Sequence, residues 1–122
     1  MRLSRLVLLS ALGPTLAGGC ANSTDERPAE FSVIVTQILR PGCATAACHD
    51  AMSAVARLDF STVAASAASI DRRRLVGGPD PDRTQLITIL TTSGGRRMPV
   101  DGPLADADIE LIRTWITDGA AH

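Results

Sequence analysis

The stretch Cys43-Ala-Thr-Ala-Ala-Cys48-His49 contains two of the three cysteines of the chain and one of its two histidines. Two thiols followed directly by an imidazole suit a covalently attached haem, because each thiol can form a thioether with a vinyl group while the histidine binds the iron. The usual spacing of such a site has two residues between the cysteines, and this chain has four. Two alternatives therefore stay open: a Cys43 to Cys48 disulfide, and a zinc site for which no fourth ligand is evident.

The beginning of the chain has the features of an export signal. Arg2 and Arg5 precede an apolar run over residues 6–12, and small residues follow before Cys20. This order predicts a signal peptide over residues 1–19. The apolar run is shorter than the about 20 residues that a membrane-spanning helix needs.

The sequence Leu16-Ala-Gly-Gly-Cys20 is similar to a bacterial lipobox, in which the cysteine is lipidated and becomes the new N-terminus. Ordinary cleavage near Ala17 would instead leave Cys20 as a free thiol, which is a liability in an oxidising compartment. We therefore expect an exported lipoprotein, periplasmic or on the outer surface, anchored to a membrane through Cys20.

The composition indicates one small domain after a short tether. Residues 20–29 are polar and aperiodic and predict a flexible tether, and residues 30–122 form the domain. The chain has 12 Lys and Arg against 13 Asp and Glu, so no basic excess points to nucleic acid. It has two Phe, one Trp and no Tyr, which makes for a thin core in a domain that is already small. A planar apolar cofactor would help to fill that core.

Apolar residues at helical spacing predict the outer helices of the domain. The first begins at Phe31 and ends at Arg40, because Pro41 and Gly42 follow. The last covers residues 106–118 and ends at Gly119. Trp115, its largest apolar side chain, should pack against the first helix or against a cofactor edge.

Between these helices the pattern is weaker. Residues 50–57 predict a turn or short helix, and a second helix should reach about Leu75 with Asp59 or Ser61 as its N-cap. A third should follow the Gly- and Pro-rich stretch 77–81, with Asp80 or Asp82 as its cap. The run of arginines at residues 72–74 offers a partner for a haem propionate.

Met98 stands in a loop, residues 91–104, that also contains Gly94, Gly95 and Pro99. A methionine is usually core filler. Here no periodic pattern explains a buried thioether, so Met98 is a candidate ligand. Met52 lies only three residues after His49, Met1 is lost with the signal, and His122 is the terminal residue, which makes each of them a poorer candidate.

In their order, the parts of residues 30–122 resemble a small monohaem c-type cytochrome domain, class I-like, of an exported bacterial lipoprotein. The resemblance implies an all-α bundle of three to five helices around one haem, with the N- and C-terminal helices packed together. The segments that carry it are Ile38-Leu39-Arg40-Pro41-Gly42-Cys43, Cys48-His49, Leu58-Asp59-Phe60, residues 76–81, Arg97-Met98-Pro99 and residues 104–120.

The resemblance implies thioethers at Cys43 and Cys48, with His49 and Met98 as the two axial ligands of the iron. It implies electron transfer rather than catalysis, with redox proteins as partners and no small-molecule substrate. Two features depart from the usual pattern: the four-residue spacer, and Ala105 where a serine cap is common, so Asp106 should cap the last helix. The alternative function is a haem-free helical binding module held together by a Cys43 to Cys48 disulfide.

Overall fold

The computed structural model describes residues 25–122. The predicted signal peptide over residues 1–19, the lipidation site Cys20 and the first part of the tether lie outside the described residues. Within residues 25–122 every regular element is helical and no strand is present, which confirms the all-α class. None of the helices in this part of the chain is long and apolar enough to cross a bilayer.

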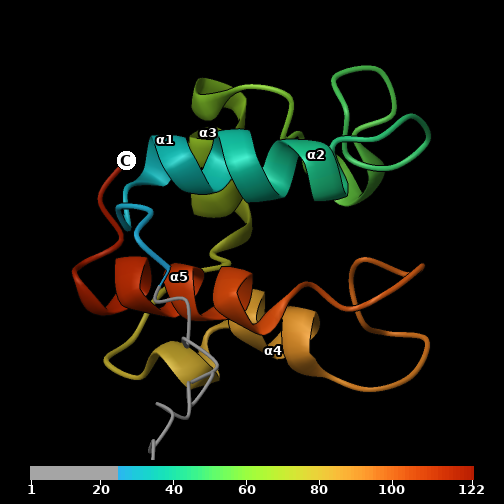
Figure 1. The fold of residues 1–122 in the computed structure, drawn as a ribbon. Helices are drawn as coiled ribbons and strands as arrows, with labels where there is room; N and C mark the ends of the chain where they lie inside the picture. Colours follow the sequence, from blue (N-terminus) through green and yellow to red (C-terminus); the bar gives the residue numbers. More distant parts are fainter. Residues whose placement is uncertain (1–24) are drawn as a thin grey trace, which may run out of the picture.

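The first helical run is longer than predicted. It consists of α1 (Phe31–Ile34), the π-helical turn η1 (Val35–Leu39) and α2 (Arg40–Cys43), which follow one another without a break (Figure 1). The predicted end at Arg40 is therefore wrong, because Pro41 and Gly42 lie inside the run. Proline lacks an N–H group and its ring collides with the carbonyl four residues back in a regular helix. The wider turn in front of Pro41 accommodates this defect, and the helix delivers Cys43 as its last residue.

A loop and a short helical turn, η2 (Val55–Arg57), lead from Cys43 to α3 (Val63–Arg73). The N-cap of α3 is Thr62, whose Oγ1 accepts a hydrogen bond from the N–H of Ala65 at 3.1 Å. The predicted caps are wrong for this helix. Asp59 instead accepts hydrogen bonds from the N–H and the hydroxyl of Ser61, which forms a separate turn before the helix.

The next segment contains η3 (Pro81–Arg83) and α4 (Gln85–Thr91). Asp80 does act as a cap, but for η3, where its carboxylate accepts from the N–H of Asp82 at 3.0 Å. The cap of α4 is Thr84, whose hydroxyl donates to the Pro81 carbonyl at 2.7 Å and accepts from the N–H of Ile87. Thr84 is only 2% exposed, so this cap is part of the core.

The last helix, α5 (Asp106–Thr117), follows the prediction closely. Ala105 precedes it without a side-chain cap, and Asp106 is its first residue, so the predicted capping by Asp106 is wrong. The carboxylates of the first turn still lie favourably at the positive end of the helix dipole. Gly119, with φ of +105°, ends the helix as predicted.

The first and last helices pack together through their aromatic side chains. The rings of Phe31 and Trp115 are stacked with a centroid distance of 5.2 Å and an interplanar angle of 25°. The indole N–H of Trp115 donates to the Ala121 carbonyl at 2.9 Å. Trp115 therefore anchors α5 against α1. Around this contact the core is aliphatic, and its buried members include Ile34, Val35, Ile38, Leu39, Ile70, Ile87, Leu90, Ile109 and Ile112.

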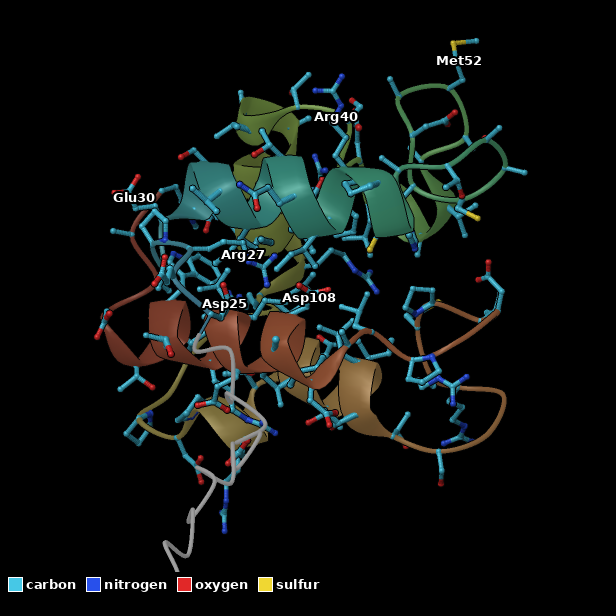
Figure 2. The ribbon with its side chains drawn as sticks, viewed as in Figure 1. Asp25, Arg27, Glu30, Arg40, Met52 and Asp108 are labelled. Carbon is cyan, nitrogen blue, oxygen red and sulfur yellow. The ribbon has the colours of Figure 1, made fainter. Side chains whose placement is uncertain are left out.

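Part of the segment predicted as a tether contacts the domain. The guanidinium of Arg27 donates to the Asp108 carboxylate of α5 at 2.7 Å and also pairs with Asp25 (Figure 2). These contacts raise the pKa of Arg27 and lower that of Asp25. The contacts between the N-terminal segment and α5 therefore begin before residue 30.

Two long loops project from the same side of the helical layers and face each other (Figure 1). One follows α2 and the other connects α4 to α5. Cys48, His49 and Met98 lie on these loops, and Cys43 is the last residue of α2, directly before the first loop.

Candidate functional site

A cavity of about 650 Å³ lies between the two loops. Its walls come from the end of α2, the loop after it and residues 98–103 of the loop before α5. Cys43, Cys48, His49 and Met98 all line it. The fold thus brings Met98 to the Cys43 to His49 motif from a distant part of the chain. The volume falls within the about 300–1,000 Å³ that small-molecule and cofactor pockets occupy.

His49 is held in one orientation by backbone and aromatic contacts. Its Nδ1 lies 2.9 Å from the Val55 carbonyl oxygen, and its ring meets Phe60 edge-on at a centroid distance of 5.5 Å. Because a carbonyl can only accept, Nδ1 carries the proton in this hydrogen bond. In the neutral ring Nε2 then keeps its lone pair and can bind a metal. A histidine ligand whose other nitrogen donates to a carbonyl is the usual arrangement in metal sites.

Hydrogen bonds fold the loop back onto the motif. The N–H of Val55 donates to the Cys48 carbonyl at 2.9 Å, and the N–H of Phe60 donates to the His49 carbonyl at 2.8 Å. Within the loop, Asp50 accepts from the N–H groups of Met52 and Ser53. The carbonyl that orients His49 is therefore fixed by the loop itself.

The four-residue spacer forms a tight turn. The N–H of Cys48 donates to the Thr45 carbonyl at 3.0 Å, and Ala47 has φ of +68°. Ala54 and Ala56 farther along the loop also have positive φ, at 37° and 57°. Alanine adopts this left-handed conformation only at a cost, and such residues gather at functional sites. The turn returns the second cysteine to the cavity that the first one lines.

Both cysteines of the motif are free thiols, so the disulfide of the alternative prediction is not formed in this structure. Cys43 is buried, and this burial, with a smaller contribution from Cys48, raises the pKa of its thiol to about 11. Cys48 is half-buried. Among the described residues no three His, Cys, Asp or Glu side chains are grouped to hold a metal, so the zinc alternative gains no support.

Met98 is fixed in its loop at the cavity, whereas the other candidate ligands, Met52 and His122, do not line the cavity. Its N–H donates to the Ile89 carbonyl of α4 at 3.0 Å, and its side chain is half-buried against the core. Met52 is 92% exposed at the tip of the first loop and points to solvent (Figure 2). His122 contacts Phe31 and pairs with Asp71, away from the cavity.

The arginines at residues 72–74 lie outside the lining of the cavity. Sequence reasoning missed the Val55 carbonyl, which no side-chain pattern reveals. It also gave no sign that the Nε of Arg97, a residue next to Met98 but outside the lining of the cavity, is buried without a hydrogen-bond partner among residues 25–122.

Comparisons with known proteins add no relative: no family model matches the chain, and no curated protein or solved structure matches it.

Proposed function

We propose that residues 30–122 are a c-type cytochrome domain that binds one haem covalently and transfers electrons. Cys43 and Cys48 would form the thioethers, and His49 and Met98 would be the axial ligands. The observation that supports this proposal most is the convergence of all four residues on one cavity of about 650 Å³. Two thiols, a histidine with a free Nε2 and a thioether fit the donor set that haem c needs.

The bound group supplies a reversible one-electron couple. The Val55 carbonyl sets the tautomer and the orientation of His49, and Phe60, 4% exposed, shields the ring from water on one side. The hydrogen bond from the Met98 N–H to α4 holds the thioether on the other loop. If His49 and Met98 both held the iron, no coordination position would be left for a substrate, and the chain would act as an electron carrier rather than as an enzyme.

The proposed haem domain is a helical bundle in which the Phe31 to Trp115 contact joins the N- and C-terminal helices. We further propose that the chain is exported and held at a membrane by lipid on Cys20. Its partners would then be redox proteins at that surface.

The deciding experiment is expression of the full chain in a bacterium that carries a haem c maturation system. Haem that stays with the polypeptide after acid-acetone extraction supports the proposal. The matched control replaces both Cys43 and Cys48 by Ala and should lose the haem. A colourless wild-type protein with a Cys43 to Cys48 disulfide would refute the proposal in favour of the binding module, and one zinc per chain would favour the zinc site.

A further inference from the structure

The carbonyl that orients His49 belongs to the turn η2, whose backbone is unfavourable on its own. Ala54, Ala56 and Arg57 all have positive φ, at 37°, 57° and 62°. None of the three is a glycine, so each left-handed conformation costs free energy. A turn with three such residues keeps its shape only when its surroundings hold it.

The Val55 carbonyl oxygen takes part in two hydrogen bonds at once. One comes from Nδ1 of His49 at 2.9 Å, and the other from the N–H of Leu58 at 3.2 Å. A carbonyl oxygen has two lone pairs, so these two bonds complete its capacity. The direction of this oxygen therefore depends on where the Leu58 N–H is held.

Arg72 of α3 holds that N–H through the peptide group to which it belongs. The Nη2 of Arg72 donates to the Arg57 carbonyl at 3.1 Å. The Arg57 carbonyl and the Leu58 N–H are the two ends of one planar peptide group, so a contact that fixes one also fixes the other. The chain of contacts thus runs from Arg72 through this peptide to the Val55 carbonyl and the His49 ring.

A second contact joins α3 to the same segment. The Oγ of Ser69 accepts from the N–H of Asp59 at 2.9 Å, and it also lies 3.4 Å from the Arg72 Nη2. Ser69 is fully buried, so α3 is firmly placed beside the loop at this point. Ser69 holds the chain just beyond the turn, and Arg72 reaches back to the turn itself.

On the basis of the proposed function, we propose that Arg72 is a positioning residue for the iron ligand His49. It fixes the peptide that directs the Val55 carbonyl, and this carbonyl keeps the ring proton on Nδ1 and leaves the lone pair of Nε2 for the metal. A ring that loses this acceptor exchanges between its two tautomers, and the Nε2–H form cannot bind iron. Arg72 acts on the site in this way without lining the cavity.

The test begins with the haem-free full chain at about pH 8, where a typical histidine ring is neutral. The ring-nitrogen chemical shifts of His49 give the ratio of the Nδ1–H form to the Nε2–H form. Arg72→Gln removes the guanidinium, and Arg72→Lys keeps a cationic donor. The matched control Arg73→Gln removes the same charge from the next residue of α3 without touching the bond to Arg57. Both positions are exposed in the last turn of α3, so these variants should keep the fold.

We expect Arg72→Gln to lower the ratio of the Nδ1–H form to the Nε2–H form about threefold, as for the loss of one exposed hydrogen bond. Arg72→Lys should keep most of the wild-type ratio, and Arg73→Gln should leave it unchanged. Equal ratios in Arg72→Gln and Arg73→Gln would overturn the proposal. A wild-type His49 ring with its proton mainly on Nε2 would overturn it as well.

In the haem-loaded chain, where Nε2 is bound to the iron, the measurement is the rate at which the Nδ1 proton of His49 exchanges with solvent deuterium. This rate should rise about threefold in Arg72→Gln and stay at the wild-type value in Arg73→Gln. An unchanged rate in Arg72→Gln would overturn the positioning role at the haem site. A chain that takes up no haem would refute the proposed function, whereas the tautomer ratios, which need no haem, decide the role of Arg72 separately.

Discussion

Replacing Ala56 by glycine should raise the free energy of unfolding, although substitution by glycine usually lowers it. Ala56 has φ of 57° and ψ of 21° and its side chain is exposed. The left-handed conformation costs an L-residue about 1–2 kcal/mol, and it has no such cost for glycine. Against this gain stands the greater freedom of glycine in the unfolded chain, about 0.4–1 kcal/mol. The net effect is a rise of roughly 1 kcal/mol in the free energy of unfolding.

The assay is urea and thermal unfolding of the full chain followed by circular dichroism. For a domain of about 100 residues, 1 kcal/mol raises the Tm by roughly 4–8 °C. The matched control is Ala68→Gly, an exposed position within α3, where glycine should cost about 1 kcal/mol. The two substitutions are chemically the same and should have opposite signs. A loss of stability in Ala56→Gly as large as in Ala68→Gly would refute the left-handed conformation, and with it the loop geometry that fixes the Val55 carbonyl.

Three further predictions concern the ligands and the anchor. In the haem-loaded protein, Met98→Ala should lower the reduction potential, abolish the ferric absorption band due to sulfur ligation and let carbon monoxide bind the iron. The control Met52→Ala, at an exposed position, should change none of these. A wild-type protein that binds carbon monoxide readily would contradict the proposal that protein ligands occupy both positions on the iron. In the haem-free protein, iodoacetamide should alkylate Cys48 well before Cys43. The alkylation rate of Cys43 should keep rising with pH toward the pKa of its thiol, about 11, because only the thiolate reacts. Equal alkylation rates of the two cysteines in the folded protein, measured by mass spectrometry, would contradict the burial of Cys43. Cys20→Ser should release the protein from membranes or block its processing, and wild-type fractionation of this variant would disprove lipidation.

Periodic apolar positions were enough to predict the outer helices, whereas their packing against each other was implied by the resemblance. Phe31 begins the first helix and Gly119 ends the last, and both follow from local rules of spacing and backbone freedom. The same rules placed a stop at Pro41, where the structure continues through a π-helical turn. A wide turn of this kind depends on the packing around it, so the sequence carries no signal for it. The caps Thr62 and Thr84 were missed for a different reason: an aspartate near each of them was predicted as the cap.

The site could be predicted in part. The chemistry of Cys43, Cys48 and His49 was evident from their spacing, and Met98 was identified by its unusual loop and by resemblance. Their convergence on one cavity needed the tertiary structure. The partner of His49 is a backbone carbonyl, and the burial of the Arg97 Nε depends on how α4 holds the loop. Neither property belongs to a residue type, so no reading of the sequence could supply them.

The ion pair between Arg27 and Asp108 limits how far the domain can travel if Cys20 carries lipid. Seven peptide steps separate Cys20 from Arg27. An extended chain covers at most about 3.6 Å per residue, so Arg27, which is paired with Asp108, stays within about 25 Å of the lipid headgroups. That reach is comparable with the diameter of a small domain. If the domain carries haem as proposed, electron exchange would then be confined to partners on the same membrane. Breaking the Arg27 to Asp108 ion pair by Asp108→Asn would then widen the range of partners without altering the haem site.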